Sequence, residues 1–259
     1  MIMANVQKEI QKWWEENSAG YQRDSNIGTR SAHYGPFSPG ESELRLLGDV
    51  KGKKILEIGC GGGQCSIAFA KQGAKCTGVD ISKEQLEYAE ELAKKNNVSV
   101  KFVQGDIQTL KQFKSSDYDI VFSAFALQYI PDLGKCFKEV YRALRKKGVL
   151  VLGLSHPFYD AISPKTMKIT RNYNKAGKFV NIETWPDGSK HKFVEFLHKI
   201  SEVTDGLIDS GFVLEKVIEP LETKGHHIGW SAGKVWREIY PRKLVKLIGP
   251  TIIFKARKP

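Results

Sequence analysis

A glycine-rich turn is the part of this sequence best suited to bind a ligand. Residues 57–63 read E-I-G-C-G-G-G, and they follow a short apolar run and precede an amphipathic stretch. Glycine lets a backbone turn sharply and approach a ligand closely, because it carries no Cβ atom. The dinucleotide fingerprint G-x-G-x-x-G would need glycine or alanine where Gln64 stands, and the Gly-Lys-Ser/Thr of a P-loop is also absent. The turn therefore predicts a site for a nucleoside without a dedicated phosphate cradle.

Two carboxylates follow the next apolar runs along the chain. Asp80 stands about 20 residues beyond the first glycine, where a carboxylate can accept two hydrogen bonds from a ribose diol. Asp106 stands in the segment Gly105-Asp106-Ile107, after a third run. The carboxyl ends of neighbouring parallel strands meet at one edge of a sheet, where ligands bind. We therefore expect the glycine turn, Asp80 and Asp106 to form one site.

The elements that must position these groups can be predicted between residues 53 and 155. Short apolar runs alternate there with amphipathic stretches, which indicates β-α-β units and an α/β fold with a doubly wound, mostly parallel sheet. The expected strands are residues 54–58, 75–80, 98–104, 118–123 and 149–154, with two more at 211–219 and 250–258.

Local signals also mark the helices of this block. Ser82 and Gln85 have the spacing of a capping box, in which each side chain bonds the backbone N–H of the other residue. Gly73 follows a helix that begins near residue 64, and Gly148 follows a helix expected over residues 134–147. Both glycines are predicted to end their helices in the left-handed conformation.

The sequence divides into four expected parts. Residues 1–43 contain an amphipathic helix over about residues 1–20 and a cap segment, and residues 44–156 form the cofactor-binding core. Residues 157–200 are interrupted by proline and glycine yet rich in aromatic residues, which favours an inserted lid and substrate subdomain over a disordered loop. Residues 201–259 return to the core sheet.

Five motifs in this order resemble those of the class I S-adenosylmethionine-dependent methyltransferases, in the branch that contains small-molecule methyltransferases. They are E-I-G-C-G-G-G, V-D-I-S at 79–82, Q-G-D-I at 104–107, F-S-A-F-A-L-Q-Y-I-P-D at 122–132 and A-L-R-K-K-G-V-L-V at 143–151. The resemblance covers about residues 44–155 well and the two last strands more loosely. It implies a Rossmann-like fold with a seven-stranded sheet, S-adenosyl-L-methionine as cofactor and S-adenosyl-L-homocysteine as product.

The resemblance also implies roles for residues that match the motifs. The glycines would pass under the methionine end of the cofactor while Glu57 orients the turn, Asp80 would hold the ribose and Asp106 the adenine amino group. Ile81 and Ile107 would cover the adenine, Ala124 and Phe125 would lie near the sulfonium, and Tyr21 would meet the methionine carboxylate. The implied cofactor contacts are Tyr21, Glu57, Gly59, Cys60, Gly61, Gly63, Asp80, Ile81, Asp106, Ile107, Ala124 and Phe125.

The contacts of the methyl acceptor are less marked in the sequence. Methyl transfer from a sulfonium gains most from alignment, and a base is needed only when the acceptor must lose a proton. His156, after the fifth strand, is expected to face the cleft as that base; the alternative is a histidine that anchors the turn into the insertion. Other candidate acceptor contacts are His33, Tyr34, Tyr129, Tyr159, Trp185, His226 and His227. The pair His226 and His227 lacks a third ligand, so no metal site is predicted.

Composition leaves alternatives for the partner. The chain carries 40 basic and 29 acidic residues, a formal net charge of +11, which invites a nucleic-acid acceptor. The excess lysines are spread along the whole chain, and their few short runs lie mostly at predicted helix ends or strand starts, so a solvated surface and a small-molecule acceptor are favoured. The alternatives are a tRNA or protein methyltransferase, or a cofactor-binding subunit without catalysis.

No apolar run approaches the ~18 residues of a membrane span, and no signal peptide is recognised. Four irregularly spaced cysteines suggest no disulfide framework, so we expect a soluble, cytoplasmic protein. The sequence predicts no oligomeric state.

Overall fold

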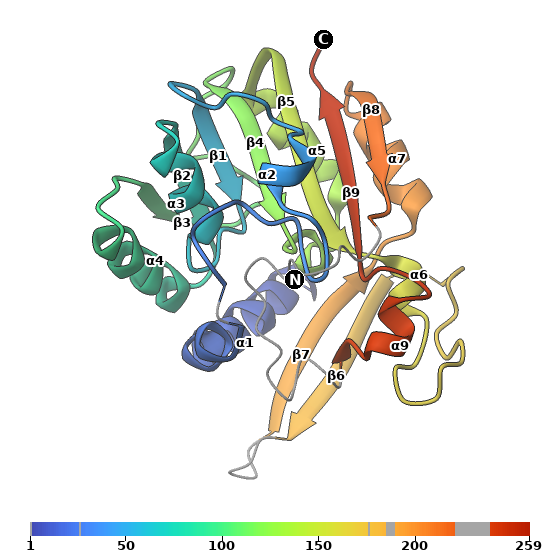
Figure 1. Ribbon diagram of the computed structural model, residues 1–259. Helices are drawn as coiled ribbons and strands as arrows, with labels where there is room; N and C mark the ends of the chain where they lie inside the picture. The colour runs from blue at the N-terminus through green and yellow to red at the C-terminus, as the bar shows by residue number, and fades with distance from the viewer. Residues whose placement is uncertain (1, 26, 176, 185–189, 221–238) are drawn as a thin grey trace.

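A seven-stranded sheet is the centre of the molecule (Figure 1). The computed structural model describes residues 2–25, 27–175, 177–184, 190–220 and 239–259. The strands lie in the order β3-β2-β1-β4-β5-β9-β8; the first five are parallel, and β9 is antiparallel to both of its neighbours. This topology confirms the predicted fold. The strands are β1 (Lys54–Ile58), β2 (Lys75–Asp80), β3 (Lys101–Gln104), β4 (Tyr118–Ala124), β5 (Leu144–Ser155), β8 (Val213–Ile218) and β9 (Thr251–Arg257).

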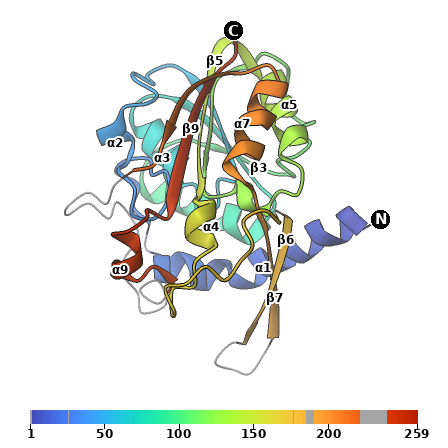
Figure 2. The same cartoon turned by 90° about the vertical axis from the view of Figure 1, so that its right-hand side faces the viewer.

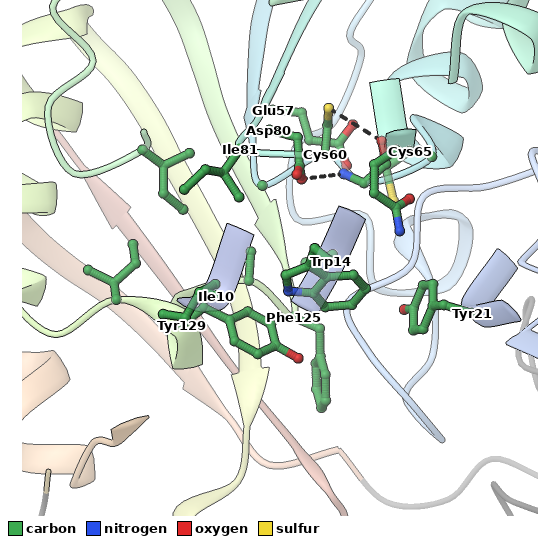
Figure 3. A pocket seen from close by; sticks show the side chains of 18 of the residues that line it. Ile10, Trp14, Tyr21, Glu57, Cys60, Cys65, Asp80, Ile81, Phe125 and Tyr129 are labelled. Atoms are coloured by element: carbon green, nitrogen blue, oxygen red, sulfur yellow. Dashed lines mark hydrogen bonds between the residues drawn. The ribbon is translucent and has the colours of Figure 1, made fainter. Parts of the chain in front are cut away.

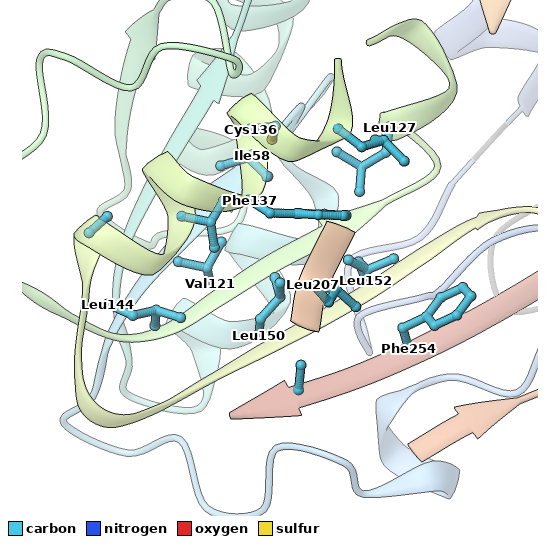
Figure 4. Close-up of a cluster of buried hydrophobic side chains, with 14 of the residues drawn as sticks. Ile58, Val121, Leu127, Cys136, Phe137, Leu144, Leu150, Leu152, Leu207 and Phe254 are labelled. Carbon is cyan, nitrogen blue, oxygen red and sulfur yellow. The ribbon is translucent and has the colours of Figure 1, made fainter. Parts of the chain in front are cut away.

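Two apolar layers bury the two faces of this sheet. On one face lie α5 (Leu133–Ala143) and α7 (Ile200–Asp209), and Phe137 and Leu207 pack there against the strands (Figure 4). On the other face, α3 (Gln64–Lys71) and the segment before β1 cover the sheet, with Phe69 in edge contact with Phe122. Successive strand residues point to opposite faces, so a strand covered on both sides must be apolar throughout. The continuous apolar runs of the sequence therefore correspond to central strands.

The predicted end of one helix is wrong. Gly73 has φ +87° and follows α3 as expected, but Gly148 does not take a left-handed conformation. Helix α5 ends at Ala143, because Leu144 already pairs with Tyr118 and begins β5. Lys147, with φ +63°, is the left-handed residue of this turn.

Only one of the two hydrogen bonds of the predicted capping box forms at the start of α4 (Lys83–Lys95). Ser82 Oγ accepts a hydrogen bond from the backbone N–H of Gln85 at 3.2 Å, as expected. The reciprocal bond is missing, because Ser82 N donates to Asp80 Oδ1 at 3.0 Å and Gln85 Oε1 accepts from Gln22 Nε2 at 2.7 Å. Ser82 N is therefore used by the strand-end acid Asp80, and the Gln85 side chain by a long-range contact with α1, rather than by the capping box.

Helix α1 (Ile2–Ser25) lies across the end of the sheet at which the parallel strands finish (Figures 1 and 2). The sequence placed this helix at about residues 1–20, and it continues to Ser25. The insertion after β5 contributes an antiparallel pair, β6 (Gly177–Thr184) and β7 (Lys190–Leu197), which extends from the same end. Val6 and Ile10 of α1 form one apolar cluster with Val194 and Phe196 of β7.

Short helical turns complete the described chain. They are α2 (Glu41–Leu44), the 3₁₀ turn η1 (Leu127–Tyr129), α6 (Pro157–Asp160) and α9 (Arg242–Val245). Within the ranges that the structure describes, no helix has both the length and the apolar character that crossing a membrane requires.

Candidate functional site

A pocket of about 900 Å³, open solvent at its mouth included, lies between the carboxyl ends of the parallel strands and helix α1. Four strand ends form its floor, and α1 supplies a roof (Figure 3). The floor contains Glu57, Gly59, Cys60, Gly61, Gly62, Asp80, Ile81, Gly105, Asp106, Ile107, Gln108, Ala124, Phe125 and Ala126; the roof contains Gln7, Ile10, Trp14, Tyr21 and Gln22.

The glycine turn brings its backbone close to its neighbours. Gly59 has φ +66°, and a Cβ atom there would lie 2.2 Å from the Cβ of Ala126. Its N–H donates to Val79 O at 2.8 Å, and the N–H of Gly61 donates to Asp80 Oδ2 at 2.8 Å. The turn after β1 is thus held by the end of β2, so the first two predicted parts of the site form one unit.

Glu57 fixes the start of α3 beneath this turn. Its side chain is buried, and Oε2 accepts hydrogen bonds from the backbone N–H and the hydroxyl of Ser66, at 2.7 and 2.5 Å. A carboxylate suits a helix N-terminus because the first N–H groups lack partners and carry partial positive charge. Burial nevertheless raises the pKa of Glu57 to about 7, against the opposing effect of the bonds from Ser66.

The raised pKa of Glu57 predicts a pH dependence of stability. The folded protein binds the proton more tightly than the unfolded chain does, so this contribution to stability is fully present below about pH 4.5. It is lost as the pH rises through about 7, which amounts to roughly 2–3 kcal/mol between pH 5 and pH 8. The variant Glu57→Gln keeps an oxygen acceptor for Ser66 but should lack this contribution. Urea unfolding of both proteins at the two pH values measures it, and parallel pH curves would contradict it.

Asp80 connects the glycine turn to the start of α4. Oδ2 accepts from Gly61 N at 2.8 Å and Oδ1 from Ser82 N at 3.0 Å, and burial raises the pKa of its carboxyl group. The side chain also lines the pocket. Each carboxylate oxygen has a second lone pair, so Asp80 can accept two more hydrogen bonds from a ligand.

Asp106 is the second acid of the pocket floor. Oδ1 accepts from Gln108 N at 2.9 Å, and Oδ2 accepts from Nε2 of Gln7 at 2.5 Å. Gln7 belongs to α1, so the roof reaches the floor here. The amide NH₂ that Asp106 binds is the same kind of donor as the amino group of an adenine ring.

Glu15 attaches α1 to the N-terminus of α4. Its carboxylate accepts from the backbone N–H groups of Lys83 and Glu84, both at 3.0 Å, and from the hydroxyl of Ser82 at 3.2 Å. Partial burial opposes ionisation, but the bonds from the two N–H groups hold the pKa of Glu15 below its ordinary value. An acid from another helix thus satisfies two free N–H groups of α4 and interacts favourably with its dipole.

A chain of amides adds a second attachment of the roof. Gln64 Nε2 of α3 donates to Gln22 Oε1 at 2.6 Å, and Gln22 Nε2 donates to Gln85 Oε1 of α4 at 2.7 Å. All three side chains are buried. Helix α1 is therefore bonded to both helices that follow the glycine turn and Asp80.

We expect Glu15→Gln to loosen the roof. The variant loses the negative charge at the helix N-terminus, which is worth roughly 1 kcal/mol, and ligand affinity should fall about fivefold. Faster amide hydrogen exchange across α1 measures the loosening. Glu16→Gln is the matched control, because Glu16 pairs with Lys12 and His191 and makes none of the contacts with α4. Equal exchange rates in the two variants would disprove the role of Glu15.

Aromatic side chains form the wall at the end of β4. The Trp14 ring meets the rings of Tyr21 and Tyr129 nearly at right angles, with centroids 5.1 and 5.4 Å apart. Figure 3 shows Trp14 between them, with Phe125 below. His33 also lines the pocket, and burial lowers its pKa to about 4.

Every sequence-predicted cofactor residue except Gly63 lines the pocket. Gly63 precedes α3 with φ +73°, and a Cβ atom there would lie 2.7 Å from the Phe102 ring, so it allows close packing instead. Of the predicted acceptor contacts, His33 and Tyr129 line the pocket, whereas Tyr34 and Tyr159 do not. The positions of Trp185, His226 and His227 lie outside the described residues.

Tyr34 and Tyr159 are packing residues in this structure. The Tyr34 side chain is buried on the sheet face that α3 covers, and its hydroxyl donates to Glu41. Tyr159 packs with Leu244 and Val245 of α9, and its hydroxyl donates to Ile239 O at 3.0 Å. The expectation that they reach the acceptor therefore does not match their positions.

His156 does not face the pocket, contrary to the sequence-based expectation. Its side chain is 2% exposed; Nδ1 accepts from Phe158 N at 3.2 Å, and Nε2 lies 2.8 Å from Glu219 Oε1. It caps α6 at the entrance to the insertion. The alternative interpretation, a histidine that anchors this turn, agrees with these contacts, and the geometry gives no support to His156 as a base.

Sequence reasoning missed the polar residues by which α1 contacts the floor. Gln7, Glu15 and Gln22 are common residues of a helix surface, and the partners by which they contact the floor and its helices lie 42 to 99 positions away. The amphipathic pattern, with Trp14 on its apolar side, was the only signal that α1 covers another part of the protein.

The doubly wound sheet, with a glycine turn and two strand-end acids around one pocket, has the architecture of class I S-adenosylmethionine-dependent methyltransferases. A model of the methyltransferase-domain family matches residues 49–202, more than half of the chain. The chain belongs to this family and is an S-adenosylmethionine-dependent methyltransferase.

Individual relatives agree with this assignment. The uncharacterized methyltransferase YbaJ of Bacillus subtilis is 26% identical over 174 residues, which cover 64% of this chain and 68% of that protein. The ubiquinone biosynthesis O-methyltransferase of Coxiella burnetii is 28% identical over 212 residues, which cover 82% and 81%. The crystal structure of an S-adenosylmethionine-dependent methyltransferase from Mesorhizobium loti covers 83% of this chain and 94% of its own, with 23% identity and a TM-score of 0.64. It shows the same fold.

Proposed function

We propose that this chain transfers the methyl group of S-adenosyl-L-methionine to a small-molecule acceptor, in the pocket beneath α1. One observation carries the proposal: the glycine turn, Asp80 and Asp106 lie around one pocket, as the family's cofactor site requires. When bound, the cofactor supplies an electrophilic methyl group on a sulfonium. The residues of this chain hold and align it, and alignment can supply roughly 7–11 kcal/mol of the barrier reduction.

The polar groups of the floor suit such a cofactor. Asp80 keeps two lone pairs for the hydroxyls of a ribose diol. Asp106 accepts a hydrogen bond from the NH₂ group of Gln7, and the amino group of an adenine ring would be the same kind of donor. Gln85 also lines the pocket, and its Nε2 has no hydrogen-bond partner among the described residues. A buried donor without a partner is costly, and a ligand hydroxyl would satisfy it.

The remaining proposed cofactor contacts line the same pocket. Backbone at Gly59, Cys60 and Gly61 would pass under the methionine end, which Tyr21 would meet from the roof, with Glu57 holding the turn. Ile81 and Ile107 would cover the adenine ring. Ala124 and Phe125, at the end of β4, would lie near the sulfonium.

The roof supports a small-molecule acceptor over a macromolecular one. Helix α1 covers the pocket and is itself held by β7, through the apolar cluster of Val6, Ile10, Val194 and Phe196 and an ion pair between Glu9 and Lys192 at 2.7 Å. The relative from Coxiella burnetii carries a name that refers to ubiquinone biosynthesis, which supports the same general class of acceptor here. We also propose that residues 1–43 and 157–200 act as cap and lid, and residues 44–156 and 201–259 as the core.

Two measurements test the proposal. Calorimetry should detect binding of S-adenosylmethionine and S-adenosylhomocysteine, and S-adenosylhomocysteine should form from the cofactor when a small-metabolite extract is added. Bulk tRNA is the comparison for the alternative acceptor class, since phosphate contacts would make its binding strongly salt-dependent. Turnover with tRNA but not with the extract would refute the small-molecule acceptor, and the absence of cofactor binding would refute the site.

A further inference from the structure

The pocket has two chemically different halves. The acids Asp80 and Asp106 lie at the ends of β2 and β3, in the half assigned above to ribose and adenine. The half at the end of β4 is formed by apolar and aromatic side chains: Ile10, Trp14, Tyr21, Phe125, Tyr129 and Ile130. The sulfonium is proposed to lie near Ala124 and Phe125, so the aromatic half is where an acceptor must approach the methyl group.

In the aromatic half, which we call the box, adjacent rings stand nearly at right angles to one another. Trp14 stands at 85° to Tyr21 and at 88° to Tyr129, and Figure 3 shows Phe125 beneath these rings. Tyr129 is supported from outside by Phe193 of β7, with ring centroids 5.9 Å apart. Rings that meet edge to face present both a face and an edge to their neighbour, which is the arrangement that aromatic pairs prefer. A flat ring placed in this box can stack on one wall and meet another by its edge.

Phe125 is held in an unfavourable backbone conformation at the floor of the box. Its φ is +59°, which is uncommon for a bulky residue and costs roughly 1–2 kcal/mol. Its N–H donates to Gly153 O at 2.8 Å, and its ring lies so close to Gly35 that a Cβ atom on Gly35 would be 2.5 Å away. Such strain persists where surrounding contacts enforce it, typically at binding sites. The surroundings thus keep this ring in one place.

The charge of the lining indicates the charge of the acceptor. Among the residues that the structure describes, the pocket lining contains no lysine or arginine, although the chain has 40 of them. His33 carries no charge at neutral pH, because burial lowers its pKa to about 4. An anionic acceptor would lose its hydration here without gaining a lysine or arginine of the described lining as a partner, which is unfavourable.

We propose that the acceptor is a neutral, flat aromatic molecule that binds between Trp14, Tyr129 and Phe125 and is methylated on a hydroxyl, amino or thiol substituent. This inference rests on the proposed function. The lone pair of the acceptor's heteroatom forms the new bond to the methyl carbon, while the electron pair of the S–CH₃ bond passes to sulfur and leaves neutral S-adenosylhomocysteine. The proton of the acceptor substituent passes to water.

Binding of matched probes to the S-adenosylhomocysteine complex tests this proposal without relying on turnover. We expect 2-naphthol to bind about tenfold more tightly than decahydro-2-naphthol, which has the same carbon skeleton without the aromatic rings. It should likewise bind at least tenfold more tightly than 6-hydroxy-2-naphthoate, which adds one negative charge. Equal or tighter binding of the saturated or the anionic probe, or binding of none of the three, would overturn the acceptor class. Failure of S-adenosylhomocysteine itself to bind would overturn the proposed function instead, and this inference with it.

Variants of Tyr129 locate the preference in the box. Tyr129→Leu should reduce the ratio between the aromatic and the saturated probe to about two, whereas Tyr129→Phe, which keeps the ring, should retain it. Tyr88→Leu is the matched control, because Tyr88 is 37% exposed on α4 and absent from the pocket. Thermal unfolding shows whether each variant folds, and Trp14→Leu is the second test if Tyr129→Leu does not. An unchanged ratio in a folded Tyr129→Leu or Trp14→Leu protein would overturn the proposed location.

Discussion

Replacing Asp80 by alanine is expected to weaken S-adenosylmethionine binding by about 100-fold or more. The variant would lose the acceptor for two ribose hydroxyls, and hydrogen bonds to a charged group are worth roughly 1.5–3 kcal/mol each. It would also release the backbone N–H groups of Gly61 and Ser82, which Asp80 now holds at 2.8 and 3.0 Å. Both the contact with the ribose and the shape of the turn would change, so the loss of binding free energy should be about 3 kcal/mol or more.

Calorimetric titration with S-adenosylhomocysteine measures this effect directly. Asp205→Ala is the matched control, since Asp205 is exposed on α7, a helix that contributes no residue to the pocket lining. The variant Asp80→Asn separates the two causes, because it keeps one oxygen acceptor but loses the charge; its affinity should lie between those of the wild type and Asp80→Ala. Binding by Asp80→Ala at wild-type strength would remove Asp80 from the cofactor site.

The core of this fold could be predicted because each central strand is covered on both faces. Such strands appear as continuous apolar runs, and β1 and β2 begin and end as their sequences indicated. Strand β3 is shorter than the expected 98–104, because only Lys101–Gln104 pair with β2 at the edge of the sheet. Strand β5 is longer than expected and takes residues from the preceding helix. Pairing partners, not local propensity, decided these two limits.

The floor of the site could be predicted for a different reason. Asp80, Asp106 and the glycine turn each follow a strand, and parallel strands bring their carboxyl ends together whatever the details of packing. The prediction that His156 faces the cleft also relied on its place after a strand, but it was wrong. The backbone continues from β5 directly into α6, where the ring caps the helix through Phe158 N and contacts Glu219. Proximity to a strand end places a residue near the site, but the next turn decides where its side chain points.

The roof could not be predicted, because its contacts join residues far apart in the sequence. Gln7 and Asp106 are separated by 99 positions, and Glu15 and Lys83 by 68. A glutamate on a helix usually contacts solvent or a residue three or four positions away. Nothing local distinguishes Glu15 from Glu16, and yet one binds the start of α4 while the other pairs with His191.

Replacing Gly59 by alanine is the second change for which we expect a large effect, and Gly52 provides a matched comparison. Both glycines have positive φ, +66° and +73°, so each substitution places a side chain in the left-handed conformation at a cost of roughly 1–2 kcal/mol. They differ in the space around them. A Cβ atom on Gly59 would lie 2.2 Å from the Cβ of Ala126, whereas a Cβ atom on Gly52 would meet nothing within 4 Å.

Gly59→Ala should therefore be about 1–3 kcal/mol less stable than Gly52→Ala, the usual cost of overpacking a filled site, and urea unfolding of the two variants measures this difference. The same overlap predicts the effect on function. Ala126 lies on the loop after β4 beside Phe125, so relief of the clash must move either the glycine turn or the aromatic floor, and both line the pocket. Gly59→Ala should lose S-adenosylmethionine binding while Gly52→Ala keeps it. Equal stability of the two variants, or cofactor binding by both, would show that the close approach of the turn to β4 is not what shapes the site.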